Sequence, residues 1–429
     1  MSYEFSIKYL ETLPRFTGKP GLERIKKLLQ LLDNPEKNLK FVHVTGTNGK
    51  GSTSATIESI LRHAGYKTGL FTSPHLFTYH ERIKVNNQDT DDEKFNKNLE
   101  KVRQAALEMT GENESLKPAL FEVLLAMAFL HFQEEKVEIA IMEAGIGGLL
   151  DSTNVIDGLV AVITNVDLEH TQVLGETKEK IALQKSGIIK NGAYVFTADT
   201  DQKVRNIFAH VSAEKNAKFS WLKTDDVQLT HQSLEGQIFD FGKYKALRIP
   251  FLGKYQMYNT ALAVLAAESL RYFGFEIDEE AIRTGLQKVY WPLRLEIVHK
   301  DPAILIDVGH NLHGIATIHQ VISDLFPACR KILVMGASYD KPYQEMATIL
   351  AKEADVVILT KAKYHGAEPA ELIKNIDTSG KEIYLTTNVE EAMLKAQKIA
   401  TPKDLIMVLG GLYLGAEACR AVKEIYSSS

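Results

Sequence analysis

Residues 41–52 read FVHVTGTNGKGS, a β-branched run that leads into three glycines, a lysine and a serine. The run Phe41–Thr45 predicts a buried strand, and Ser52–Leu61 has the apolar spacing of an amphipathic helix. Strand, glycine loop and helix in this order can cradle phosphate, because glycines let backbone N–H groups converge on an anion and the helix N-terminus adds a favourable dipole. Lys50 would then lie beside the phosphates.

The match to the standard phosphate-loop pattern is incomplete. That pattern places Ser or Thr directly after the lysine and a glycine five residues before the last glycine. Here Gly51 follows Lys50, and Val44 holds the early position. This stretch alone therefore leaves open a glycine-rich turn with a solvated lysine.

Length and composition limit the class of protein. A chain of 429 residues is too long for one ordinary core and predicts two or three domains. With 45% apolar and 24% charged residues it has the composition of a globular protein. The 50 basic and 55 acidic residues give a net charge of −5, which argues against nucleic acid as a partner.

The cysteines and the N-terminal stretch indicate the cellular compartment in which the protein is expected. Cys329 and Cys419 are far apart and lack metal-ligand spacing, which fits a reducing cytosol. The opening MSYEFSIKYLETL is polar and does not resemble a signal peptide, and no apolar run approaches the roughly 20 residues that span a bilayer. We expect a cytoplasmic monomer without membrane contact.

The pattern along the chain predicts α/β architecture. After the glycine loop, strands are expected in KTGLFTSP, VEIAIMEAG and LVAVITNV, separated by helical stretches, as in a mostly parallel sheet. Residues 226–250 alternate like a hairpin and predict a small antiparallel patch. Five further strands from Ala303 onward, each followed by a helical segment, predict a smaller Rossmann-like domain without a GxGxxG opening. We place the domains at 1–293 and 294–429.

Polar side chains follow several of these strands, where ligands of parallel sheets bind. Ser73 follows the second strand, Glu143 ends the third, and His170 comes soon after the fourth. Carboxylate and hydroxyl oxygens suit Mg²⁺, which is usually held by one or two protein groups together with phosphates and water. The alternatives are a surface carboxylate for Glu143, a turn serine before proline for Ser73 and a local hydrogen-bonding group for His170.

Four more residues are candidates with open alternatives. Lys185 lies on a predicted helix, where a solvated lysine is the default. Asp307 and His310 stand at a strand end in DVGHN, and Arg294 lies on the expected linker. A basic residue there could clamp phosphate, although a structural ion pair explains it equally well.

Taken together the motifs become specific. In order along the chain they are VTGTNGKGS, LFTSPHL with HERI, MEAGIGGLLDSTNV, LEHTQVLG, KSGIIK, WPLRLE and DVGHN. This series resembles the folylpolyglutamate synthase and dihydrofolate synthase family of Mur-ligase-like, ATP-dependent amide ligases, from about residue 5 to 420. The additional Gly51 is typical of that family.

The resemblance implies an N-terminal ATP-binding domain of the Mur-ligase central type, a C-terminal Rossmann-like glutamate-ligase domain, and roles for matching residues. Catalysis would involve Lys50, Lys185 and His310, with Lys185 able to carry a carbamate. Two Mg²⁺ ions would be held by Ser73, Glu143 and His170. The residues expected to contact ATP are Thr47, Asn48, Gly49, Lys50, Gly51, Ser52, Asn259, Arg294 and Asp307.

Two departures from the family pattern are visible. DVGHN replaces the usual DGAHN but keeps Asp307, His310 and Asn311. In GGLLDSTN, Leu149 stands where many members have arginine. Because that loop lies near the pterin in the family, the second change bears on substrate preference.

The implied reaction adds L-glutamate to the γ-carboxylate of a folate, or to dihydropteroate, and releases ADP and phosphate. ATP would first phosphorylate the carboxylate, and metal ions with Lys50 would spread the negative charge. The residues leave open a phosphate-loop NTPase or kinase that forms no amide, and a nucleotide-binding module without turnover. A ligase of peptidoglycan precursors is less consistent, because the phosphate loop begins near residue 45 and leaves no room for an additional N-terminal domain. The preferred folate and the length of the glutamate tail stay open.

Overall fold

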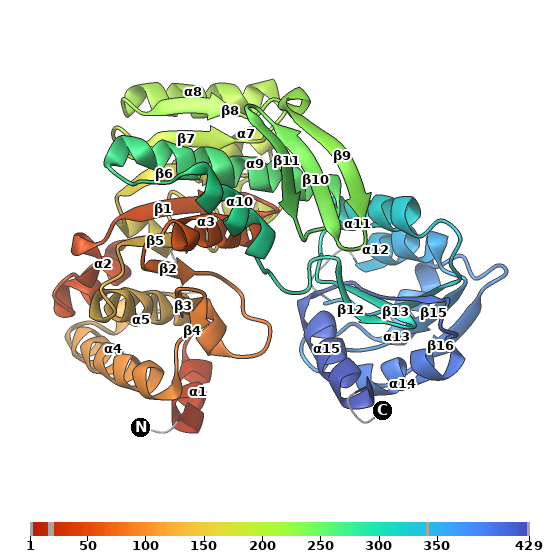
Figure 1. Ribbon diagram of the computed structural model, residues 1–429. Coiled ribbons are helices and arrows are strands. Elements are labelled where there is room, and N and C mark those ends of the chain that lie inside the picture. The colour runs from red at the N-terminus through yellow and green to blue at the C-terminus, as the bar shows by residue number, and fades with distance from the viewer. Residues whose placement is uncertain (1–2, 16–20, 340–342, 427–429) are drawn as a thin grey trace. The chain divides into compact units, whose positions relative to one another are not determined.

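The structure is a computed structural model that describes residues 3–15, 21–339 and 343–426. The chain forms two compact units (Figure 1). The first comprises residues 1–228, 239–249 and 256–290, and the second comprises residues 229–238, 250–255 and 291–429. Within the described residues, no helix combines the length and the apolar character that crossing a bilayer requires.

The first unit is built on an eight-stranded sheet in the order β4-β3-β2-β5-β1-β6-β7-β8 (Figure 1). The six strands from β2 to β8 are parallel, and β3 and β4 add an antiparallel edge. The strands are β1 (Phe41–Thr45), β2 (Thr68–Phe71), β3 (Ile83–Val85), β4 (Gln88–Asp89), β5 (Ile139–Glu143), β6 (Gly158–Ile163), β7 (Tyr194–Thr197) and β8 (Lys218–Trp221).

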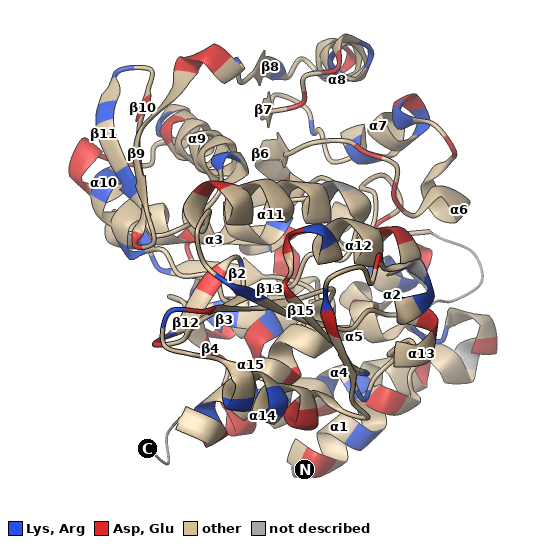
Figure 2. Cartoon of the chain, turned by 90° about the vertical axis from the view of Figure 1, so that its right-hand side faces the viewer, with Lys and Arg blue, Asp and Glu red and all other residues tan. Residues whose placement is uncertain are grey.

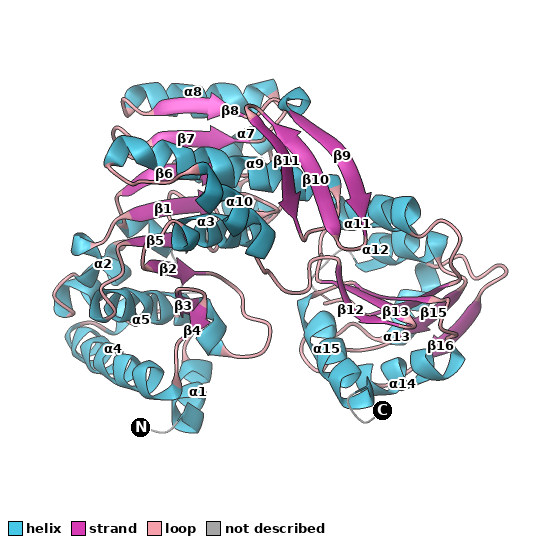
Figure 3. Ribbon diagram, in the orientation of Figure 1, coloured by secondary structure: helices cyan, strands magenta, loops and turns pink. Residues whose placement is uncertain are grey.

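Helices cover both faces of this sheet (Figure 3). The connection from β1 to β2 and the one from β2 to β5 run in opposite directions along the sheet, so right-handed crossovers place their helices on opposite faces. The helices are α1 (Tyr3–Thr12), α2 (Glu23–Leu31), α3 (Lys50–His63), α4 (Asp92–Glu112), α5 (Leu120–Glu134), α6 (Thr171–Leu174), α7 (Lys178–Ser186), α8 (Gln202–Glu214), α9 (Lys254–Ser269) and α10 (Glu279–Lys288).

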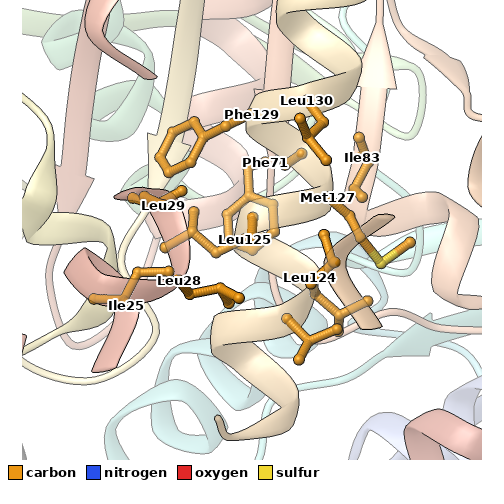
Figure 4. Packing of buried hydrophobic residues seen from close by; sticks show 14 of the residues in the cluster. Ile25, Leu28, Leu29, Phe71, Ile83, Leu124, Leu125, Met127, Phe129 and Leu130 are labelled. Atoms are coloured by element: carbon orange, nitrogen blue, oxygen red, sulfur yellow. The ribbon is translucent and has the colours of Figure 1, made fainter. Parts of the chain in front are cut away.

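The largest core of the first unit packs around α5 (Figure 4). This helix is apolar on all sides and fully buried from Glu122 to Phe132. Its leucine and phenylalanine side chains meet residues of α2, together with Phe71 of β2 and Ile83 of β3 (Figure 4). Burial of one such side chain contributes about 2 kcal/mol, so this core fixes the half of the sheet that carries β2 and β5.

A three-stranded sheet in the order β11-β10-β9 precedes α9. Its strands are β9 (Val227–Ser233), β10 (Gly236–Phe241) and β11 (Tyr244–Ile249). The two-residue connections between them allow only antiparallel pairing. The expected antiparallel patch at 226–250 is therefore present.

The second unit contains a six-stranded sheet in the order β12-β13-β17-β14-β15-β16. All pairs are parallel except β12 with β13. The strands are β12 (Glu296–Lys300), β13 (Ala303–Asp307), β14 (Lys331–Met335), β15 (Val356–Leu359), β16 (Glu382–Leu385) and β17 (Leu405–Leu409), and the helices are α11 (Leu312–Leu325), α12 (Tyr343–Leu350), α13 (Pro369–Leu372), α14 (Val389–Ile399) and α15 (Leu412–Tyr426).

Charges of both signs share the same helices. Figure 2 shows Lys and Arg next to Asp and Glu along α10 and α14, for example, while the strands are mostly uncharged. This distribution fits the small net charge of −5. Opposite charges on one helix face stabilise the helix only slightly, by about 0.2–0.5 kcal/mol per pair.

The predicted fold class is confirmed in both units, and one local prediction is wrong. The helix after the glycine loop was expected to be amphipathic, but α3 is buried from Gly51 to Leu61. The reason is α10, which packs against it so closely that a Cβ on Gly285 would lie 2.6 Å from the Cα of Ile60. The antiparallel edge strands β3, β4 and β12 and the long helix α4 were not predicted.

Candidate active site

The glycine loop follows β1, the central strand of the parallel sheet. Hydrogen bonds from the segment that follows β6 hold the loop in place. Thr47 N donates to Asn165 O at 3.0 Å, and Asn48 N donates to the Asn165 side chain at 2.9 Å. Asp167 N donates to Thr47 Oγ1 at 2.9 Å. The end of β6 therefore fixes the conformation of the loop.

Two glycines of the loop are required by close packing. Gly46 has φ of 153°, and a Cβ there would lie 1.8 Å from Thr164 Oγ1. Gly49 has φ of 84° and forms the N-cap of α3. A Cβ on Gly49 would lie 2.4 Å from the side-chain oxygen of Asn259, which is on α9. Asn259, which the resemblance assigns to ATP contact, thus lies directly against the loop.

Lys50 begins α3 and folds back over the loop. Its Nζ donates to the carbonyl oxygens of Gly46 at 3.0 Å and Thr47 at 3.1 Å. The ammonium group therefore lies over the loop that would surround a phosphate. Behind it, Gln256 of α9 is fully buried and donates to Ser52 Oγ at 3.3 Å.

Glu143 and Ser73 meet at the carboxyl ends of two neighbouring strands. Glu143 pairs in register with Val44 of β1, one residue before the end of that strand. Its side chain is only 3% exposed, and Oε2 accepts a hydrogen bond from Ser73 N at 3.0 Å. The structure thus brings this carboxylate next to both the glycine loop and the serine after β2.

Mg²⁺ fits this arrangement only together with a phosphate ligand. Among the described residues, no group of three His, Cys, Asp or Glu side chains could hold a metal without outside ligands. A buried carboxylate beside a phosphate loop is nevertheless a suitable partial set, because Mg²⁺ usually keeps water and substrate phosphates as its other ligands.

His170 lies on the segment that leads from β6 into α6. It is exposed and adopts the left-handed conformation with φ of 51°, at the N-cap of α6. That conformation costs most residues about 1 kcal/mol or more. The side chain is therefore held at a turn by the surrounding backbone and is accessible to a ligand.

Lys185 is buried, which overturns the expectation of a solvated helix lysine. Only 3% of it is exposed. Burial lowers the pKa of its amine to about 7, and the positive charge of Lys50 acts in the same direction. Glu169 and Asp151 raise the pKa but do not compensate. Near neutral pH a large fraction of this amine is uncharged.

The backbone of residues 147–149 packs against α7 at Lys185. Leu149 N donates to Gln184 O at 2.7 Å, and a Cβ on Gly148 would lie 2.8 Å from the carbonyl oxygen of Lys185. A Cβ on Gly187 would lie 2.3 Å from the Cα of Leu149. The two glycines therefore let this loop approach the backbone of α7 closely.

The second unit carries Asp307 at the end of β13. Its carboxylate accepts hydrogen bonds from Leu295 N at 2.9 Å and Gly309 N at 2.6 Å. Burial raises the pKa of Asp307, while the charge of Arg294 opposes that shift. His310 Nδ1 lies 3.2 Å from Val308 O.

The backbone around Arg294 is strained. Leu293 and Leu295, which flank it, have φ of 55° and 49°, although both are bulky and nearly fully buried. Such conformations cost about 1–3 kcal/mol each and persist where the surroundings determine them. Asp307 supplies part of that constraint through its bond to Leu295 N.

Comparison with known proteins identifies the family. Residues 44–267 match the Mur ligase middle domain, and residues 293–412 match the Mur ligase glutamate ligase domain. Dihydrofolate synthase/folylpolyglutamate synthase of Bacillus subtilis is 33% identical, over 98% of this chain and 99% of that protein. The chain belongs to the folylpolyglutamate synthase/dihydrofolate synthase family.

Solved structures of this family have the same fold. The Escherichia coli protein in complex with DHPP and ADP superposes with a TM-score of 0.87 at 27% identity, covering 99% of this chain and 98% of that one. The bifunctional folylpolyglutamate synthase/dihydrofolate synthase from Yersinia pestis, complexed with AMPPNP and Mn, gives 0.85 at 27% identity and covers 98% of each chain. The fold of a folylpolyglutamate synthase/dihydrofolate synthase is thus shared along the whole chain.

In the first unit, most of the predicted site residues lie close together. They are Thr47, Asn48, Gly49, Lys50, Gly51, Ser52, Ser73, Glu143 and Asn259, with Lys185 near enough to Lys50 for their charges to interact. Arg294, Asp307 and His310 cluster in the second unit.

Sequence reasoning missed the residues that support the loop. Thr164 donates to Asn48 O at 2.6 Å, and Gln256 links Ser52 to Asn259. The sequence did contain a signal for Thr164, because the stretch TNVD places polar residues directly after a strand. Gln256 lies in the first turn of α9, and no motif in the sequence marks it.

Proposed function

We propose that this protein is an ATP-dependent ligase that adds L-glutamate to the γ-carboxylate of a folate and releases ADP and phosphate. The observation that carries the proposal is the grouping of a glycine loop, the overlying Lys50 and the buried Glu143 at one edge of the sheet. Relatives whose names contain this activity cover the whole chain. We further propose that the ATP-binding domain of the Mur-ligase central type ends at residue 293 and that the Rossmann-like glutamate-ligase domain begins at residue 294.

The reaction proceeds in two steps. An oxygen of the folate carboxylate attacks the γ-phosphorus of ATP, and ADP leaves with the electrons of the broken P–O bond. The glutamate amine then attacks the acyl carbon and releases phosphate, while the amine loses a proton. Lys50 lowers the barrier to the first step, because its charge offsets the negative charge that gathers on the phosphates.

The loop and α9 orient the nucleotide. The backbone N–H groups of Gly49 to Ser52 begin α3, where an anion is favoured. Asn259 borders the loop and is placed to contact the nucleotide. In the second unit, Arg294 and Asp307 take the corresponding nucleotide contacts, and His310 acts beside them.

Ser73, Glu143 and His170 would hold Mg²⁺, which supplies charge neutralisation of the phosphates when bound. Two ions are proposed. Glu143 Oε2 accepts a hydrogen bond from Ser73 N at 3.0 Å, and because a carboxylate has about four lone-pair positions, this bond is compatible with a role as a metal ligand.

Lys185 is proposed to carry a carbamate. Its uncharged amine adds to carbon dioxide, a C–N bond forms, and one proton is released. A pKa of about 7 favours this step, because only the neutral amine is a nucleophile. The product is an anion that replaces a cation beside the phosphate site.

Dihydropteroate is proposed as a second acceptor, which would make the enzyme bifunctional. A phosphate-loop NTPase or kinase would instead consume ATP without glutamate. The test is ADP release measured with tetrahydrofolate or dihydropteroate, with and without glutamate. We expect release to depend on both glutamate and the pterin substrate. ADP release at the same rate without glutamate would contradict the ligase and favour the NTPase.

A further inference from the structure

The segment Thr164–Asp167 supports the glycine loop from the side of β6. It makes hydrogen bonds to Thr47 and Asn48 through backbone and side-chain atoms. The position of the loop therefore depends on the position of this segment. The segment is not part of a strand, because β6 ends at Ile163.

One buried carboxylate holds this segment from the opposite side. Asp199 follows β7, and its Oδ2 accepts a hydrogen bond from Val166 N at 2.7 Å. Its Oδ1 accepts from Asp201 N at 2.8 Å. The side chain of Asp201 in turn caps α8 by accepting from Lys203 N. Asp199 thus ties the loop-supporting segment to the N-terminus of a helix.

The hydrogen bond from Val166 N to Asp199 is buried and does not lie at the surface. Asp199 is only 6% exposed, and burial raises its pKa even though two N–H groups and Lys178 favour the charged form. A second link from the same turn, Ala198 N to Thr164 O at 3.2 Å, begins one residue earlier. Removing the carboxylate would leave the N–H of Val166 without its buried acceptor, which favours movement of the segment.

We propose that Asp199 is a positioning residue for the nucleotide: through Val166 it fixes the segment that holds Thr47 and Asn48 against the phosphates. The expected change in KM for ATP rests on the proposed function. The proposal goes beyond that function because it assigns a role to Asp199, whose carboxylate is hydrogen-bonded to Val166 N and Asp201 N, behind the segment that supports the loop.

The test compares Asp199→Ala and Asp199→Asn with Asp404→Ala. Asp404 is an equally buried aspartate in the second unit, 6% exposed, and it also accepts a backbone hydrogen bond, from Thr401 N at 2.8 Å. All variants are assayed well below their melting temperatures. The measurements are KM for ATP, KM for glutamate, and the Kd of ADP by calorimetry, which requires no turnover.

We expect Asp199→Ala to raise KM for ATP and Kd for ADP by about tenfold or more, with KM for glutamate little changed. Asp199→Asn retains one acceptor oxygen and should lie between the alanine variant and the wild type. Asp404→Ala should lower the melting temperature and leave nucleotide affinity unchanged.

Two results would overturn the proposal. One is a lower melting temperature of Asp199→Ala with wild-type affinity for ADP. The other is an equal rise in KM for ATP and for glutamate. If the wild type released no ADP in response to glutamate, the proposed ligase would fail, but calorimetry would still decide the role of Asp199.

Discussion

Lys50 and Lys185 belong to one electrostatic site but have opposite surroundings. Lys50 is half-buried and donates to two carbonyl oxygens of the glycine loop. Lys185 is almost fully buried, and its pKa falls to about 7. Two identical side chains thus have different surroundings: one donates hydrogen bonds over the glycine loop, and the other can lose its proton near neutral pH.

The difference shows that hydration decides what a lysine can do. A backbone carbonyl is a partner for the charged form, so it keeps Lys50 suited to bind an anion. Burial away from water penalises the charged form of Lys185 instead. The repulsion between the two lysines reinforces the contrast, because the charge of Lys50 lowers the pKa of Lys185 further.

The largest effect we expect is on stability as a function of pH. The folded chain releases the Lys185 proton near pH 7, whereas the unfolded chain releases it near its ordinary value of 10.5. Between these values the unfolded state binds the additional proton, so this group makes stability rise with pH from about 7 to 10.5. Lys185→Met lacks this dependence and should be more stable than the wild type below pH 7, by at most about 5 kcal/mol.

Denaturant unfolding in buffer free of carbon dioxide and Mg²⁺ measures that difference. It should be constant below pH 7 and shrink steadily above it. A difference that is the same at pH 6 and pH 10 would show that the Lys185 amine is hydrated, and the contrast with Lys50 would disappear.

Loss of Lys50 tests the other half of the comparison. We expect Lys50→Ala to stay folded and to lose about 10²- to 10³-fold in kcat, because one main electrostatic stabiliser of the phosphates is gone. Lys67→Ala is the control, since Lys67 is a partly exposed lysine paired with Glu135. Steady-state ADP release is the measurement, and turnover like the wild type would refute the role of the loop.

Lys185→Ala should lose about 100-fold in kcat and recover partly with concentrated acetate, which would replace the carbamate oxygens. Lys185→Arg should not recover, because its cation persists and cannot add carbon dioxide. The exposed Lys180, on the same helix, provides the control variant Lys180→Ala. Full activity of Lys185→Arg would exclude the carbamate.

The smallest expected effect concerns the metal. Glu143→Ala and His170→Ala should each raise the Mg²⁺ concentration for half-maximal turnover about tenfold, because water replaces a protein ligand. Glu138→Ala is the control, as Glu138 immediately precedes β5 and lies at its opposite end. Unchanged magnesium titrations in both variants would leave Glu143 and His170 with structural roles only.

The features that could be predicted are those that local sequence determines. β1 and the glycine loop are encoded by adjacent residues, and the parallel strands of both units by short apolar runs. Glu143 followed from its place at the end of such a run. Asn259 and Lys185 could be assigned only through the family resemblance, since nothing around them in the sequence distinguishes them from ordinary helix residues.

The rest depends on contacts between distant segments. The close packing of the 147–149 loop on α7 needs Gly148, and the burial of α3 needs the small Gly285 of α10. The edge strand β12 is half-buried and lacks the apolar run that marked its neighbours. Asp199 has no motif around it, and only the folded chain shows that Val166 lies against it.

The contact between Gly46 and Thr164 also constrains how this sequence can change over generations. A Cβ at position 46 would meet the Thr164 hydroxyl at 1.8 Å, yet that hydroxyl holds Asn48 O at 2.6 Å. Before Gly46 could mutate to a residue with a side chain, Thr164 would have to lose its hydroxyl. A protein with only that first change would lack the hydrogen bond from Thr164 to Asn48 O that supports the loop. The dependence runs in one direction, and we expect a side chain at position 46 to survive in descendants only where position 164 has already lost its hydroxyl.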